Sequence, residues 1–155
     1  MSGVIEARLA ELGVVLGEAT APAANYVPFV QVGDTLFVSG QISMENGEMI
    51  TGKVGVDLSV EQGAAAAKVC AINLLAQVKA ACGGDLDKLA RVVKLTGFVN
   101  STPDFGDQPK VINGCSDFLV EALGDIGRHA RSAVSAGALP FNVAVEIEGI
   151  FQLKP

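Results

Sequence analysis

The stretch that decides the fold of this chain is Arg131-Ser-Ala-Val-Ser-Ala-Gly-Ala-Leu-Pro-Phe-Asn-Val-Ala-Val-Glu-Ile-Glu-Gly-Ile-Phe151. Two segments rich in apolar and β-branched residues flank Gly-Ala-Leu-Pro at 137–140, and this pattern predicts two strands joined by a short loop. The first strand opens with Arg131, and the second carries Glu146 and Glu148. A charge on an otherwise apolar strand is costly unless it is paired or used, so these three residues are candidates for a functional site.

The second of these strands has two different faces because side chains alternate along a strand. One face carries the series Val143, Val145, Ile147, Gly149 and Phe151, and the other carries Ala144, Glu146, Glu148 and Ile150. If the helices of the domain cover the apolar face, the opposite face is free to meet another subunit. The two acids are then expected near a subunit interface.

The rest of the chain supplies helices and further strands around this pair. Apolar spacing predicts a helix over 5–12, a long helix that follows the capping box at 59–62 and ends at Gly83-Gly84, and a helix over 108–123. Strands are predicted over 28–32, 36–39 and 91–100, with a tight turn at Asn46-Gly47. The sequence therefore predicts an α+β fold, with two helices on one face of a mixed sheet and a short N-terminal helix before it.

Length and hydropathy indicate one domain that associates with itself. The chain has 155 residues, which suits a single domain over 1–155, with a helical extension over 1–20 and a core over 21–155. Hydrophobic residues make up 50% and the mean hydropathy is +0.42, so the apolar surplus is expected to cover a subunit interface. No apolar run reaches the roughly 18 residues of a membrane span, and the N-terminus lacks a signal-peptide pattern.

Charge and cysteine usage narrow the partners. The net charge is −6 and no Lys/Arg cluster is present, which argues against nucleic acid as a partner. Cys70, Cys82 and Cys115 form no CxxC pair and lie in apolar contexts, which fits packing groups in a reducing cytosol. With His129 as the single histidine, a zinc site would need unusual partners. We expect a cytoplasmic protein that binds a small molecule without a metal or other cofactor.

Three segments of the chain resemble the YjgF/Rid family of small α+β proteins. The first runs from Ala21-Pro-Ala-Ala through Phe29-Val-Gln to Leu36-Phe-Val-Ser-Gly-Gln-Ile42. The second is Asn113, a few residues into the predicted helix over 108–123. The third, and the most specific, combines Arg131-Ser, Leu139-Pro140 and Val145-Glu-Ile-Glu148. Together the three segments cover most of residues 21–152.

The resemblance implies a chorismate-mutase-like homotrimer with three clefts between subunits. It also implies hydrolysis of 2-imino acids, or their enamine tautomers, to 2-keto acids and ammonia without a cofactor. Arg131 is at the position of the family's carboxylate-binding arginine, and Glu146 at that of the glutamate that orders water and transfers protons. Ser39 and Gly40 match the loop that lines the cleft, and Asn113 matches a further polar position near it.

Two departures from the family pattern indicate a divergent subgroup. Many members have a tyrosine where this chain has Phe29, after a one-residue insertion that includes Tyr26, a second source for that hydroxyl. Ala133 replaces a frequent cysteine, whose role rests largely on backbone groups that alanine retains. The N-terminal helix is a further addition to the family pattern.

Alternative interpretations remain open at this stage. The same cleft would serve a non-catalytic regulatory trimer that senses a small carboxylate, whereas an endoribonuclease is disfavoured by the acidic charge. Arg131 would also suit a surface ion pair, and Glu148 a solvated position on the strand. His129 is either a proton carrier near Arg131 or a structural residue.

Overall fold

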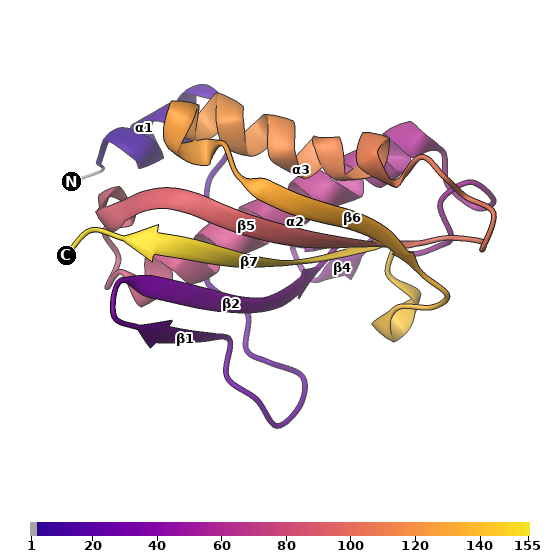
Figure 1. Ribbon diagram of the computed structural model, residues 1–155, viewed down its shortest axis with the longest axis horizontal. Helices are drawn as coiled ribbons and strands as arrows, with labels where there is room; N and C mark the ends of the chain where they lie inside the picture. The colour runs from indigo at the N-terminus through magenta and orange to yellow at the C-terminus, as the bar shows by residue number, and fades with distance from the viewer. Residues whose placement is uncertain (1–2) are drawn as a thin grey trace.

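A five-stranded mixed sheet carries the fold in the computed structural model, which describes residues 3–155 (Figure 1). In spatial order its strands are β1 (Phe29–Val32), β2 (Thr35–Ile42), β7 (Val145–Leu153), β5 (Leu89–Asn100) and β6 (Ala130–Ala136). The helices are α1 (Val4–Glu11), α2 (Val60–Ala81) and α3 (Gln108–Leu123), and the short 3-10 turns are η1 (Leu86–Lys88), η2 (Gly124–Gly127) and η3 (Pro140–Asn142). A separate hairpin joins β3 (Met44–Glu45) to β4 (Glu48–Met49).

The local sequence patterns that predicted where helices and turns begin or end are found at those places in the structure. The Ser59 hydroxyl accepts from the Gln62 backbone N–H at 3.1 Å, and the Gln62 side chain accepts from the Ser59 N–H at 2.8 Å, which completes the capping box of α2. Asn46 and Gly47 both have positive φ, 54° and 79°, as the tight turn between β3 and β4 requires. The predicted helix over 108–123 is confirmed with the same bounds as α3.

The two C-terminal strands are confirmed, but they are not neighbours in the sheet. β5 lies between them, parallel to β6 and antiparallel to β7. A parallel pair needs a crossover, and α3 provides it between β5 and β6. The loop from β6 to β7 therefore passes the end of β5. There the Lys53 ammonium donates to Gly137 O at 2.6 Å and to Asn100 Oδ1 at 2.9 Å, and Asn100 donates to Val143 O at 3.0 Å.

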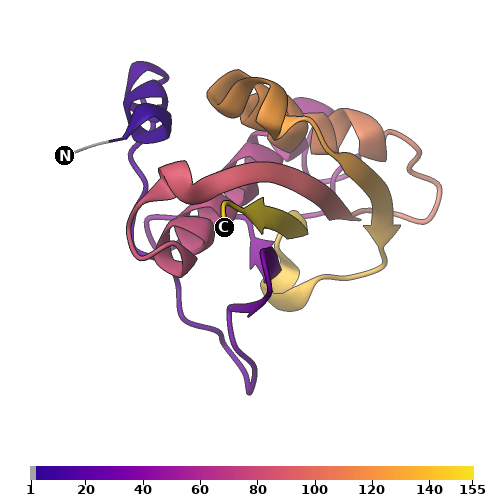
Figure 2. The ribbon, with the colours of Figure 1, turned by 60° about the vertical axis from the view of Figure 1, so that its left-hand side comes forward.

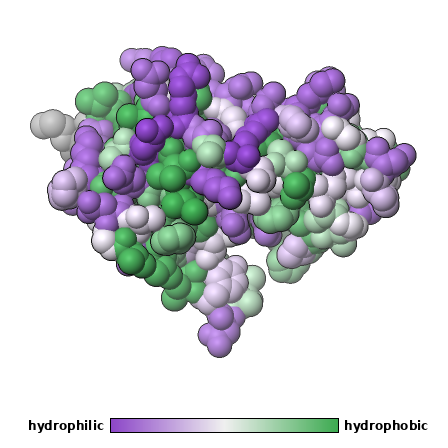
Figure 3. Space-filling model, viewed as in Figure 1, coloured by the Kyte–Doolittle hydropathy of each residue, from purple (hydrophilic) through white to green (hydrophobic). Residues whose placement is uncertain are grey.

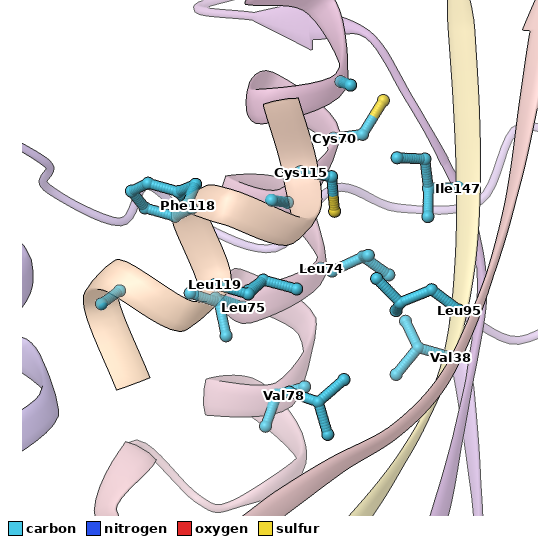
Figure 4. Packing of buried hydrophobic residues seen from close by; sticks show 14 of the residues in the cluster. Val38, Cys70, Leu74, Leu75, Val78, Leu95, Cys115, Phe118, Leu119 and Ile147 are labelled. Atoms are coloured by element: carbon cyan, nitrogen blue, oxygen red, sulfur yellow. The ribbon is translucent and has the colours of Figure 1, made fainter. Parts of the chain in front are cut away.

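Helices α2 and α3 cover one face of the sheet, and the main core lies between them and the strands (Figures 1 and 4). Figure 4 shows side chains from both helices meeting those of β2, β5 and β7; the labelled contacts are Val38, Cys70, Leu74, Leu75, Val78, Leu95, Cys115, Phe118, Leu119 and Ile147. By length and composition α2 is apolar enough to cross a membrane, but 56% of its most apolar window is buried in this core. All three cysteines are buried and free, as expected.

Within residues 3–155, no helix covers the opposite face of the sheet, and this face is partly apolar (Figures 2 and 3). Strand register puts Val30, Phe37 and Ile150 in one row across this face. A second row holds Ile42, Glu146, Phe98 and Val134. Phe37 is 45% exposed and Val134 43%, so this face presents apolar side chains to its surroundings. The predicted division into two faces is confirmed along β7, because Val145, Ile147 and Phe151 are fully buried on the helix side. Ala144, predicted on the open face, lies just before β7 and is fully buried in the core.

Candidate functional site

A cavity of about 440 Å³ opens between three segments that are far apart in the sequence. Its walls are the loop before β1, the end of β2 with the following hairpin, and the η3 turn, and one residue each of α2 and β7 completes them. The lining residues are Thr20, Ala21, Pro22, Ala23, Ala24, Tyr26, Pro28, Gly40, Gln41, Ile42, Met44, Met49, Gln77, Pro140, Phe141 and Glu146. Figure 3 shows the molecular surface hollowed between the projecting loop and the lobe that contains η3. The lining is mostly apolar, which suits a small organic ligand.

Glu146 supplies the carboxylate on this wall, and Gly40 lies directly against it. A Cβ atom placed on Gly40 would lie 2.7 Å from Glu146 Oε2 and 2.9 Å from Cδ, so only glycine leaves the carboxylate its present position. Glu146 is half-buried, and burial, with a smaller contribution from the charge of Glu148, raises the pKa of its carboxyl group. Such a group is suited to exchange protons closer to neutral pH. Glu148 itself is exposed.

Ser39 holds the loop that forms one side of the cavity. Its hydroxyl donates to Val27 O at 2.8 Å, and its backbone N–H donates to Pro28 O at 2.9 Å. These bonds fix the chain next to Tyr26, which is 48% exposed and lines the cavity. Ser39 was predicted to line the site; the structure shows it supporting the wall through its hydrogen bonds.

Phe29, predicted to bind substrate, does not line this cavity. It pairs with Val38 at the start of β1 and packs with it against the core, on the helix-covered side of the sheet. The cause is the alternation of side chains along β1, which turns Phe29 toward the core and Val30 toward the open face. Tyr26, three residues earlier, is the aromatic residue of this segment that reaches the cavity.

Arg131 lies on β6, with its guanidinium on the helix-covered side of the sheet. One terminal nitrogen donates to the Ser116 hydroxyl at 3.0 Å and the other to Pro109 O at 3.2 Å, both on α3. Ala133, two residues along, faces the same side and packs against the core. Asn113 is exposed on α3. Arg131, Ala133 and Asn113 thus belong to the α3 side of the molecule, away from the cavity lining.

One chain does not bring Arg131 and Glu146 together. Arg131 pairs with Leu95 of β5, a helix-side residue, whereas Glu146 pairs with Phe98 on the open side. The two residues are two strands apart across the sheet and three residues apart along β5. Standard strand geometry makes each of these two separations roughly 10 Å. Their side chains therefore extend from opposite faces of the sheet.

His129 belongs to the Arg131 side. Its Nδ1 lies 2.6 Å from Gly127 O and its Nε2 lies 2.8 Å from the Ser116 hydroxyl that also contacts Arg131. Burial, and to a lesser extent the charge of Arg131, lower the pKa of His129, while its bond to Gly127 opposes this effect. Burial thus favours the neutral imidazole.

Residues 3–155 contain no cluster of three His, Cys, Asp or Glu side chains that could hold a metal ion. Burial raises the pKa of Cys115 to about 12 and that of Cys70 well above its usual range. These thiols remain protonated, as packing groups do.

Sequence reasoning missed Gln77, which lines the cavity from α2. It is 1% exposed, its amide nitrogen donates to Thr20 O at 2.9 Å, and its amide oxygen has no hydrogen-bond partner among the described residues. A polar residue within the apolar stripe of α2 was the available signal. Phe141 was also missed, although a large aromatic residue after Leu139-Pro140 marked it; it is 61% exposed and has a φ of 59°.

Comparison with known proteins assigns the chain to a family. Residues 6–151 match the YjgF/chorismate mutase-like family, whose description also names an endoribonuclease. Protein TCP17 of Trypanosoma cruzi is 47% identical over 155 residues, 99% of this chain and 96% of that protein. A 2-iminobutanoate/2-iminopropanoate deaminase of Dermatophagoides farinae is 32% identical over 138 residues, 88% of this chain and 91% of that protein.

Solved structures agree with this assignment. The Agrobacterium tumefaciens protein Atu1372, of unknown function, superposes with a TM-score of 0.91 at 53% identity, covering 97% of this chain and 93% of that one. Escherichia coli TdcF with bound serine superposes with a TM-score of 0.62 at 26% identity, covering 89% and 94%. The relative that is named a deaminase is thus less similar to this chain, at 32% identity, than TCP17 and Atu1372, at 47% and 53%, whose names give no activity. The chain belongs to the YjgF/chorismate mutase-like family, in a divergent subgroup with TCP17 and Atu1372.

Proposed function

We propose that this protein hydrolyses 2-imino acids, or their enamine tautomers, to 2-keto acids and ammonia. The observation that carries the proposal is a half-buried carboxylate with a raised pKa, Glu146, on the wall of a mostly apolar cavity. A related protein that is 32% identical is named as such a deaminase, which supports the same chemistry. The reaction adds water across the C=N bond and needs one group that takes a proton and returns it.

Glu146 performs both transfers in the proposed mechanism. Its carboxylate takes a proton from water as the water oxygen bonds to C2 of the imine, and it gives that proton to the imine nitrogen, which becomes an amine. In the resulting carbinolamine the C2 hydroxyl gives its proton to the carboxylate, which passes it to the amine nitrogen; the C–N bond breaks, ammonia leaves and the C2 oxygen becomes the keto group. Arg131 binds the substrate carboxylate through two parallel N–H groups, which orients C2 toward the water.

The proposed active site lies between two copies of the chain, in a homotrimer. Arg131 and Glu146 are on opposite faces of one sheet, so a shared cleft requires Arg131 from one copy and Glu146 from the next. The open face also has an apolar row that a second copy would cover, namely Val30, Phe37 and Ile150. Cyclic symmetry would give three equal clefts. Reduced, buried cysteines fit a cytoplasmic location.

A non-catalytic role is the alternative. A regulatory trimer that binds a small carboxylate would use Arg131 but would not need Glu146 to transfer protons, and TdcF is a family structure with bound serine. An endoribonuclease function, named in the family description, is disfavoured because the net charge of −6 repels a polyanion.

Subunit mixing tests the proposal. An amino-acid oxidase generates the imine in situ, and the loss of imine is followed with and without the protein. Arg131→Ala and Glu146→Gln should each be inactive as pure proteins. When the two are unfolded and refolded together at equal amounts, about one quarter of the clefts in randomly assembled trimers should hold both native residues and recover that fraction of wild-type activity.

Three outcomes oppose the proposal. Mixed trimers without activity would exclude a cleft that combines Arg131 of one copy with Glu146 of another. Wild-type protein that binds a keto acid but does not accelerate imine loss would favour the regulatory role. A scattering mass of one 15.9 kDa chain, instead of about 48 kDa, would exclude the shared cleft.

A further inference from the structure

A short chain of hydrogen bonds runs behind Arg131 and has no part in the proposed chemistry. A terminal nitrogen of Arg131 lies 3.0 Å from the Ser116 hydroxyl, and this hydroxyl lies 2.8 Å from His129 Nε2. The other ring nitrogen of His129, Nδ1, lies 2.6 Å from Gly127 O. The chain links three elements, because Ser116 is on α3, His129 precedes β6 and Gly127 ends η2. The side chains of Arg131, Ser116 and His129 are all half-buried.

The direction of each bond follows from the groups involved. A carbonyl oxygen only accepts, so the Nδ1 of His129 carries the hydrogen that it donates to Gly127 O. The neutral ring then has an unprotonated Nε2, which accepts from the Ser116 hydroxyl. With its hydrogen committed, the Ser116 oxygen presents lone pairs to the guanidinium of Arg131. Every donor and acceptor along the chain is thus matched for one protonation state of the imidazole.

We propose that Ser116 and His129 are positioning residues that hold the guanidinium of Arg131 in the orientation required to bind the substrate carboxylate. This inference rests on the proposed function, because it assigns Arg131 the carboxylate. The bond to Pro109 O alone, at 3.2 Å, leaves the guanidinium free to turn about that contact. The Ser116 bond fixes a second nitrogen, and His129 fixes the rotation of the Ser116 hydroxyl.

The same geometry makes the orientation of Arg131 depend on proton uptake by His129. A protonated Nε2 would donate to the Ser116 oxygen, so the Ser116 hydrogen would lose its acceptor and the hydroxyl that contacts Arg131 would have to turn. The charges around the ring oppose this uptake, since Arg131 acts on it directly and Arg91 and Arg128 line the same hollow. Asp125, 3.4 Å from the Arg128 Nε, is the acid on the adjoining turn. The matched state is therefore held through neutral pH and given up as the pH falls.

Two pairs of variants separate positioning from a general structural role. Ser116→Ala removes the acceptor, whereas Ser116→Thr retains a hydroxyl. His129→Leu removes the acceptor for the Ser116 hydroxyl, whereas His129→Gln offers an amide oxygen near the place of Nε2 and does not titrate. The readouts are KM and kcat for imine hydrolysis and, independently of turnover, the Kd for 2-oxobutanoate from pH 5 to 8 by calorimetry.

We expect Ser116→Ala and His129→Leu to raise KM and the 2-oxobutanoate Kd about tenfold at pH 7.5, the loss of roughly one hydrogen bond to a charged group, with kcat nearly unchanged. Ser116→Thr and His129→Gln should stay within about threefold of wild type on the same scale. The wild-type Kd should rise as the pH falls through the pKa of His129, and His129→Gln should flatten this rise.

Because His129 is the single histidine of the sequence, its ring nitrogens can be followed by NMR without overlap once any affinity tag is removed. The wild type should show the Nδ1–H tautomer at neutral pH, and Arg131→Ala should raise the pKa of the ring. Equal KM and Kd values in Ser116→Ala, His129→Leu and wild type would overturn the inference, as would an Nε2–H tautomer. If wild type does not hydrolyse imines, the proposed function fails, but the Kd and NMR results still test the positioning of Arg131.

Discussion

Replacing Gly40 with alanine tests whether the position of the Glu146 carboxylate matters for catalysis. The added methyl group would lie 2.7 Å from Oε2, 2.9 Å from Cδ and 3.1 Å from Cγ of Glu146. These separations are shorter than carbon–oxygen and carbon–carbon contacts allow, so the carboxylate must move by roughly 0.5–1 Å or rotate away. A misplacement of about 1 Å in a catalytic group costs on the order of 10²-fold in rate, and we expect kcat for imine hydrolysis to fall by that amount.

Folding should be affected far less than turnover. The clash involves the end of a flexible side chain, and Gly40 is not among the glycines with positive φ, so alanine suits its backbone. We expect a loss of no more than about 1 kcal/mol in the free energy of unfolding, measured by denaturant titration. Gly106→Ala is the matched control, because a Cβ there meets nothing within 4 Å. If Gly40→Ala and Gly106→Ala both kept the wild-type kcat, the present position of the Glu146 carboxylate would not matter for catalysis.

Three further changes test other parts of the interpretation. Glu146→Gln should raise Tm at pH 7, because burial raises the pKa of this carboxyl group and its ionised form therefore costs stability. This gain in Tm should disappear as the pH falls below the usual carboxyl range. Equal melting curves of variant and wild type both at pH 7 and at such a low pH would contradict this. Arg131→Lys should weaken 2-oxobutanoate binding nearly as much as Arg131→Ala, about 30-fold or more by calorimetry, because an ammonium cannot make two parallel bonds; near-wild-type affinity would show that charge alone suffices. Asp87→Ala should destabilise the docking of α1 by about 1 kcal/mol, since Asp87 accepts from the N–H groups of Val4 at 2.8 Å and Ile5 at 3.0 Å. Faster amide exchange confined to 4–12 would report it, with Asp87→Asn as the control.

The sequence predicted several elements of this fold well because a local chemical signal marks where they begin or end. The capping box at Ser59 and Gln62 and the Asn46-Gly47 turn act over three or four residues, so no tertiary information is needed to recognise them. Strand neighbours are different. The pairing of β5 with both β6 and β7 depends on the crossover through α3, which local patterns do not specify.

The cavity was only partly predictable for the same reason. Glu146 and Gly40 were recognisable from the resemblance to a family, and their close contact explains why a glycine occupies that position. Phe29 was assigned to the site from alignment with a tyrosine, but alternation along β1 directs it to the core. Tyr26, which lies before β1 and outside the alternation of that strand, is the aromatic residue of this segment that lines the cavity.

Arg131 and Glu146 were predicted to serve one site, but the fold separates them within one chain. From the sequence, Arg131 and Glu146 lie on consecutive strands and suggest a single site. In the structure β5 lies between those strands, and the register turns Arg131 toward α3 and Glu146 toward the open face. Each is also supported on its own side, Arg131 by Ser116 and Glu146 by its contact with Gly40. The proposed function needs both charges in one cleft and therefore requires Arg131 from one copy and Glu146 from another.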